Sequence, residues 1–137
     1  MIEADIIGIL QGNTTLTTAL GGINKIFYIQ AGTTATMPWL LVEVSSGTPQ
    51  KMGASRQQVT ATARLTLAIA HTSAVKGRQI MEYVKDALQG LRGDATESKD
   101  LEVRCSDVTS YAGVGATDIF NLTCTCKFME DWVTQHI

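Results

Sequence analysis

The chain has 137 residues, of which 45% are hydrophobic and 18% charged, a size and composition typical of one globular domain. Its formal net charge of −2 excludes a general electrostatic attraction to nucleic acid or to an acidic membrane. The cysteines number three, and an odd count argues against a secreted disulfide framework. We therefore expect a single domain over residues 1–137, in a reducing compartment and without a membrane partner.

The first third of the chain predicts short helices followed by two strands. Apolar residues recur at helical spacing over residues 2–10, and the run "TTLTTALGG" offers Thr14 or Thr15 as an N-cap and two glycines as a stop. This pattern predicts two short helices or one broken helix. The β-prone stretch 25–30 and the run "PWLLVEVSS", opened by Pro38, then predict two strands.

The longest stretch without periodicity is "SSGTPQKMGASRQQ", residues 45–58. It is rich in glycine, serine, proline and charge, so we expect it to be a structureless loop. A loop of this length in a compact domain is either disordered or functional.

The clearest periodic signals lie in the middle of the chain. Apolar and polar residues alternate from Val59 to Ile69, which predicts a strand with one buried face. Thr72 or Ser73 can cap the helix that follows, and we expect Gly93 to end it. The predicted apolar face of this amphipathic helix comprises Val75, Ile80, Met81, Val84, Ala87, Leu88 and Leu91.

Two further strands are predicted near the end of the chain, over residues 101–105 and 120–129. Alternation in the second strand places Cys124 and Cys126 on one face, with Cα atoms about 6.5–7 Å apart, at or beyond the limit for a disulfide. We interpret both as core residues, because free cysteine behaves as a small hydrophobe. A functional thiol pair is the alternative, and Cys105 could approach Cys126 from a neighbouring strand.

The order of elements predicts an α+β fold. We expect an antiparallel or mixed sheet, with one long amphipathic helix and short N-terminal helices packed on one face. The other face is rich in Thr, Arg, Lys, Glu and Asn, so it is either solvated or in contact with a partner.

The sequence offers little catalytic chemistry. His71 and His136 each lack a second ligand at metal-binding spacing. No phosphate-binding glycine loop and no Gly-x-Ser-x-Gly elbow occurs. We therefore expect no catalytic, cofactor-binding or metal-binding residues and no enzymatic activity.

The order of motifs resembles the tail completion (tail terminator) proteins of long-tailed bacteriophages. The resemblance rests on "ALGGINKIFYIQAG", "TTATMPWLLVEVSSGTP", the strand "VTATARLTLAIAHTS" running into "AVKGRQIMEYVKDALQGLRG", and the closing "NLTCTCKFMEDW". These segments together span residues 4–132, and their order and spacing carry the resemblance.

The resemblance implies a structural role in virion assembly. Proteins of this family form a ring, commonly six-fold, at the head-proximal end of the tail tube. The ring ends tube polymerisation and provides a docking surface for the head. The implied partners are other copies of the chain, the tail tube protein and the head–tail connector protein. DNA would pass through the lumen without specific binding, in a virion assembled in the host cytoplasm.

We expect residues 45–58 to form an interaction loop with Lys51, Met52 and Arg56 as contacts; a disordered surface loop is the alternative. Residues 94–100 are a second candidate. Trp132 either packs on a neighbouring subunit or anchors the chain end in the core.

Three alternative functions are considered for the chain. They are a head–tail joining (neck) protein, a tail tube subunit, or a small α+β enzyme or ligand-binding domain with a pocket at His71 or the cysteines.

Overall fold

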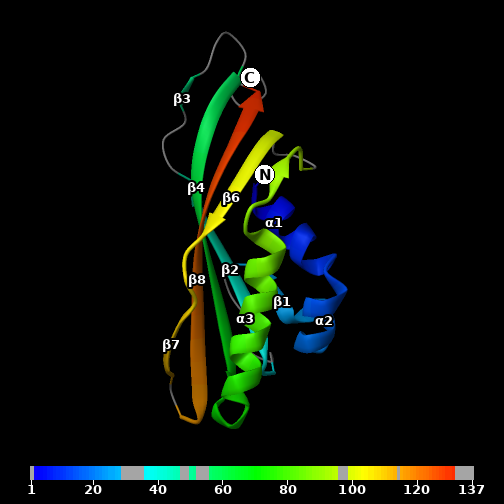
Figure 1. Ribbon diagram of the computed structural model, residues 1–137, viewed down its shortest axis with the longest axis vertical. Helices are drawn as coiled ribbons and strands as arrows, with labels where there is room; N and C mark the ends of the chain where they lie inside the picture. The colour runs from blue at the N-terminus through cyan, green and yellow to red at the C-terminus, as the bar shows by residue number, and fades with distance from the viewer. Residues whose placement is uncertain are drawn as a thin grey trace.

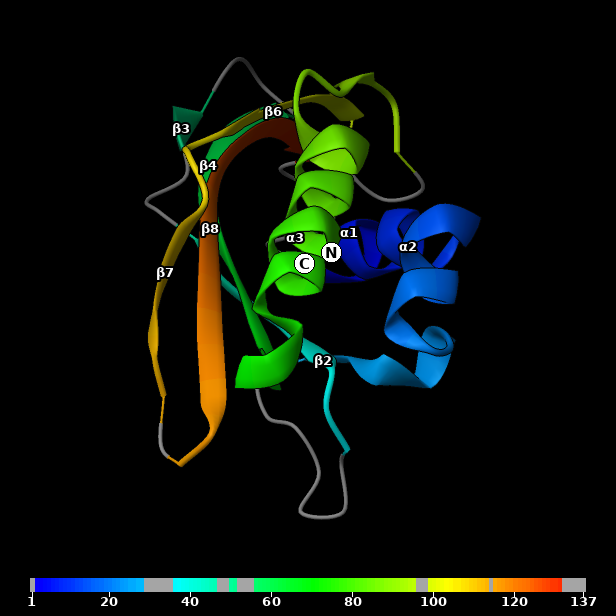
Figure 2. The same cartoon turned by 60° about the horizontal axis from the view of Figure 1, so that its bottom comes forward.

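The structure is a computed structural model that describes residues 2–28, 36–46, 50–51, 56–95, 99–113 and 115–131. These residues form two layers, a curved β-sheet and a layer of helices packed on one of its faces (Figures 1 and 2). The arrangement confirms the predicted α+β fold with helices on one side.

The chain begins with two separate helices, α1 (Ile2–Gln11) and α2 (Thr14–Leu20). The predicted caps Thr14 and Thr15 are wrong, because Asn13 is the N-cap: its side chain accepts a hydrogen bond from the Leu16 N–H at 3.0 Å. Gly21 ends α2 with a φ of 95°, a left-handed conformation that glycine adopts at no steric cost.

One sheet contains all the described strands, in the order β1-β2-β4-β8-β6-β5, with β3 paired to β4 and β7 paired to β8. The β1–β2 pair is parallel and the other described pairs are antiparallel. The strands are β1 (Ile26–Tyr28), β2 (Trp39–Ser46), β3 (Gln50–Lys51), β4 (Arg56–Ala70), β5 (Arg92–Gly93), β6 (Lys99–Cys105), β7 (Thr109–Ala112) and β8 (Thr117–Asp131). Short 3-10 helices, η1 (Ile23–Lys25) and η2 (His71–Ser73), precede β1 and α3 (Ala74–Leu88), respectively.

Part of the predicted loop over residues 45–58 is strand. Ser45 and Ser46 end β2 opposite Thr62 and Ala61, and residues 50–51 form β3. Residues 56–58 begin β4, where they pair with β8. Backbone groups pair in a sheet whatever the side chains are. Strand residues that are polar on both faces show no hydrophobic alternation, so the sequence pattern did not predict these extensions. Residues 47–49 and 52–55 lie outside the described part of the chain.

The long helix α3 ends earlier than predicted. Gly93 does not end it; the chain leaves the helix after Leu88, and Gln89 is already extended. The reason is β6, because the Gly90 N–H donates to the Val103 carbonyl and the Val103 N–H donates to Leu91. Gly93 itself lies in β5.

Val75 does not belong to the apolar face of α3. Its exposed fraction is 88%, since nine residues separate it from the buried Val84 and place it about 180° around the helix. The buried stripe comprises Gly77, Ile80, Met81, Val84 and Leu88.

The core lies between α1, α2, α3 and the inner sheet face. Alternate residues of β4 and β8 supply much of it, with the N-terminal helices contributing Ile6, Leu10, Leu16 and Leu20. Cys124 and Cys126 are fully buried in this core, which confirms their interpretation as core residues.

Gly77 allows α3 to approach the sheet closely. A Cβ atom at this position would lie 2.6 Å from Phe120 Cε1 and 2.8 Å from Ile69 Cγ2. Both neighbours belong to the central strands and are buried, so neither can move aside without disturbing the core.

We expect Gly77→Ala to lower the free energy of unfolding by about 1–3 kcal/mol, because overpacking outweighs alanine's better helix propensity. Gly8→Ala in α1 is the matched control, since nothing lies within 4 Å of its added Cβ; it should stabilise the protein by roughly 0.5–1 kcal/mol. Urea denaturation of both variants measures the difference. Equal effects would contradict the close-approach explanation.

Candidate functional site

The outer face of the sheet, the face without helices, carries side chains from five strands in aligned rows. One row is apolar and joins Trp39 of β2, Ala68 of β4, Ile119 of β8 and Tyr111 of β7. Tyr111 is 56% exposed, whereas Ala68 is 1% exposed. Sequence reasoning missed this row, because only the strand register brings these four segments together.

The remaining rows of the outer face are mostly polar, although Leu41 and Met129 also lie there. Glu43 lies opposite Arg64, and Lys127 lies between Thr60 and Glu102. Thr66 donates a hydrogen bond to the Asn121 Oδ1 at 2.9 Å. The face therefore changes from apolar at the β7 end to polar and charged at the other end.

A shallow cavity of about 280 Å³ lies within the polar part, lined by Glu102, Arg104, Thr125 and Lys127. Glu102 accepts from Arg104 at 3.1 Å and from Arg92 at 3.5 Å. Both arginines are about three-quarters exposed, so these pairs add little stability and can exchange partners.

Described residues from two of the predicted candidates, 45–58 and 94–100, lie beside the end of β8 at one end of the sheet. The register aligns Gln50, Gln58, Met129 and Lys99 across β3, β4, β8 and β6, which gathers these strand ends (Figure 1). The backbone of Lys51 lies in β3, opposite Gln57. Arg56 begins β4 opposite Asp131, the last residue of β8. We call this region the β3 end of the sheet.

The remaining predicted contacts are only partly described. Met52 and Trp132 lie outside the described residues, although Trp132 directly follows β8. In the segment 94–100, the Asp100 N–H donates to the Asp94 carboxylate at 3.0 Å. Residues 96–98 of this segment also lie outside the described part of the chain.

His71 contacts an acidic residue of a distant strand, which the sequence around His71 did not predict. Its Nδ1 lies 3.0 Å from the Asp118 carboxylate of β8, and its side chain is 72% exposed. A larger cavity of about 600 Å³ lies between α1 and the β5 region, and His71 lines neither this cavity nor the shallow one. The His71–Asp118 pair is therefore a hydrogen-bonded contact at the corner between β4 and α3, outside both cavities.

The cysteines occupy neighbouring strands. The register places Cys105 of β6 opposite Cys124, two residues along β8 from the Cys126 that the sequence suggested as its neighbour. Cys126 lies opposite Val103. All three cysteines are free thiols. Among the described residues, no group of three or more His, Cys, Asp or Glu side chains could hold a metal ion.

Comparisons with known proteins give a structural relative but no sequence relative. No known protein-family profile matches the chain, and no curated protein shows significant sequence similarity to it. A solved structure, the virion of a native gene transfer agent particle, contains a chain with a TM-score of 0.76 and 8% identity. The match covers 93% of this chain and 94% of that chain, so the two share a fold over nearly their whole lengths.

None of the described helices is both long and apolar enough to cross a membrane.

Burial raises the pKa of the Cys126 thiol to about 11, above its ordinary 9.0. As the pH rises past 9, this thiol ionises first in the unfolded chain, which then binds fewer protons than the folded protein. Ionisation of Cys126 in the unfolded chain should therefore lower the free energy of unfolding by roughly 2 kcal/mol by about pH 10.5. Urea denaturation at about pH 8 and pH 10.5 should show a smaller fall for Cys126→Ala than for the wild type. An equal fall in both proteins would contradict the assignment.

Proposed function

We propose that the chain is a structural protein of a phage-like virion that caps the head-proximal end of the tail tube. As a closed ring, with six subunits as the expected number, it would end tube polymerisation and provide the head-docking surface. The observation that carries the proposal is the fold shared over almost the full length with a chain of a gene transfer agent virion. The order of the sequence motifs supplies the more specific assignment to the tail end.

The surface of the domain suits assembly better than catalysis. A closed ring requires two different, complementary patches on each subunit. The outer sheet face supplies an apolar row with the exposed Tyr111 at one end, and aromatic residues are enriched in protein interfaces. The β3 end supplies the other candidate, where three chain segments converge. These regions lie at opposite ends of the long β4–β8 ladder (Figure 1).

The charge distribution fits a ring through which DNA passes without being gripped. The net charge is −2, and the outer face mixes both signs, with Glu43 opposite Arg64 and Glu102 opposite Lys127. A surface of mixed sign lacks the dense positive charge on which non-specific DNA binding depends.

The ring hypothesis predicts closed assemblies of one size in native mass spectrometry over a range of concentrations, seen as rings by negative-stain imaging. Open-ended tubes would instead identify a tail tube subunit and overturn the capping proposal. If only monomers form, addition of purified tail tubes decides the question. Binding at one tube end supports capping, and failure to bind the tubes contradicts it. Attachment to isolated heads without binding to tubes would favour a joining protein.

Charge reversal tests the β3 end as the tube-contacting or head-contacting surface. Lys51→Glu and Arg56→Glu should each weaken binding to tail tubes or to heads by at least about 1 kcal/mol, the loss typical of a contributing interface residue. Lys76→Glu, an exposed position on α3, makes the same charge change away from this end. Co-sedimentation with tubes and with heads measures the effect. Wild-type binding by both β3-end variants would remove this surface from the proposal.

A further inference from the structure

Cys105 and Cys124 form a cross-strand thiol pair at the inner face of the β6–β8 ladder. They are direct register partners. The neighbouring pair is hydrogen-bonded, because the Ser106 N–H donates to the Thr123 carbonyl at 2.8 Å. Since hydrogen-bonded and non-hydrogen-bonded pairs alternate along an antiparallel ladder, Cys105 and Cys124 occupy a non-hydrogen-bonded pair. Cα atoms of such pairs lie about 4.5 Å apart, within the roughly 4.4–6.8 Å that a disulfide spans.

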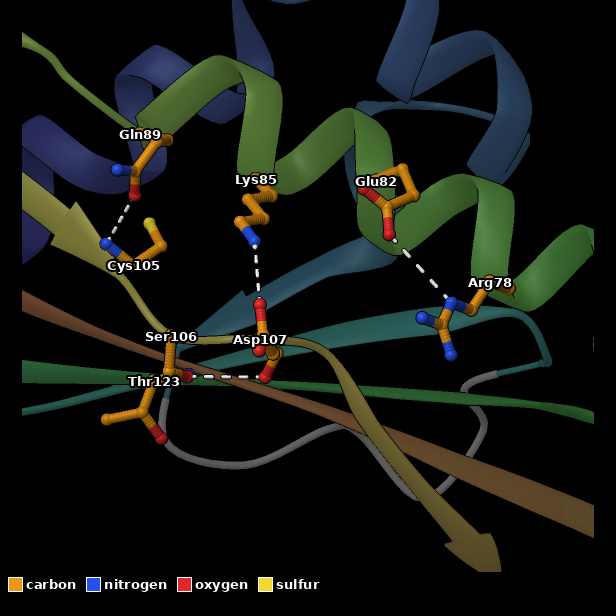
Figure 3. A network of polar contacts seen from close by, with 8 residues as sticks. All are labelled: Arg78, Glu82, Lys85, Gln89, Cys105, Ser106, Asp107 and Thr123. Carbon is orange, nitrogen blue, oxygen red and sulfur yellow. Dashed lines mark hydrogen bonds and ion pairs between the residues drawn. The ribbon is translucent and has the colours of Figure 1, made fainter.

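The end of α3 fixes the position of Cys105. The Cys105 N–H donates to the Gln89 side-chain carbonyl, and Lys85 reaches from the same helix to Asp107 at 3.4 Å (Figure 3). The register places the Cys105 side chain on the same face of the ladder as that of its partner Cys124. These contacts place Cys105 opposite Cys124 and near the positively charged Lys85 side chain.

The two thiols differ in access. Cys105 is half-buried at the end of β6, whereas Cys124 is fully buried. The hydrogen bond from Cys124, and then the charge of Lys85, lower the pKa of Cys105 despite its burial, while the same hydrogen bond raises the pKa of Cys124. Cys105 is thus the attacking thiol and Cys124 the buried second thiol.

We propose that Cys105 and Cys124 are a dithiol site that reacts with low-molecular-weight disulfides, such as oxidised glutathione, and closes to a cross-strand disulfide. The Cys105 thiolate attacks one sulfur of the small disulfide, forms a mixed disulfide and releases one small thiolate. Cys124 then attacks the Cys105 sulfur and displaces the second small thiolate, which takes up the Cys124 proton, while the first thiolate takes up the proton that Cys105 had lost. The protein loses two hydrogen atoms in total, and one small disulfide is reduced to two thiols.

Cys126 does not take part in this site. It is fully buried and faces Val103, and its same-face neighbour Cys124 lies about 6.5–7 Å away between Cα atoms along the strand. The site is independent of the assembly role, because it rests on strand register and thiol chemistry alone.

The test incubates the native protein with oxidised glutathione and measures intact mass, followed by non-reducing peptide mapping. The expected product has lost two hydrogen atoms and contains a Cys105–Cys124 linkage. A stable glutathione adduct at Cys105, a linkage to Cys126, or no reaction in a protein whose denatured form does react would each overturn the proposal.

Variants separate the two steps. Cys124→Ala should accumulate the glutathione adduct at Cys105, whereas Cys126→Ala should close the disulfide as the wild type does. Lys85→Gln should slow the reaction several-fold, with Arg78→Gln on the same helix as the matched control. Circular dichroism establishes that each variant is folded. If a cysteine variant does not fold, the wild-type peptide map decides the pairing alone, and unchanged rates for Lys85→Gln would contradict the role of the lysine.

Discussion

The pairing of β4 with β8 is the constraint on which the rest of the structure depends. All fifteen residues of β4 pair with β8, from Arg56 opposite Asp131 to Ala70 opposite Thr117. This ladder joins segments separated by a helix and three further strands, so its formation closes the long loop between them. The other strands pair outward from these two strands, with β2, β1 and β3 on the β4 side and β6, β5 and β7 on the β8 side.

The same ladder sets the two faces of the domain. Its inner residues form the sheet side of the core. The helix α3 packs on them, with Gly77 against Phe120 and Ile69. Its outer residues form the centre of an uncovered face that changes from an apolar row to polar rows along its length. A domain built in this way derives its stability from the core on one face of the sheet and leaves the other face and the strand ends uncovered.

The strand register gives the two buried cysteines of β8 different neighbours. Alternation along β8 buries Cys124 and Cys126 equally, yet the strands around them make their surroundings different. Cys124 meets a second thiol and lies near Lys85, whereas Cys126 meets Val103. The distinction between the two residues arises from their cross-strand neighbours.

The sequence by itself determined the fold class, most of the elements and the buried faces of the central strands. Hydrophobic periodicity depends on local geometry, so the alternation over 59–69 and 120–128 identified the strands and their core-facing residues, including Cys124 and Cys126. Local patterns were less informative at element ends: the cap at Asn13, the end of α3 at Leu88 and the strand residues within 45–58 depend on side-chain reach or on pairing with distant strands.

Only the tertiary structure decided which residues face one another across the sheet. The apolar row from Trp39 to Tyr111, the Cys105–Cys124 pair and the convergence of segments at the β3 end all follow from register between strands. Register depends on long-range pairing, and a shift by one residue changes every cross-strand neighbour. Local sequence therefore specified the face of each strand, and the fold specified the partners on that face.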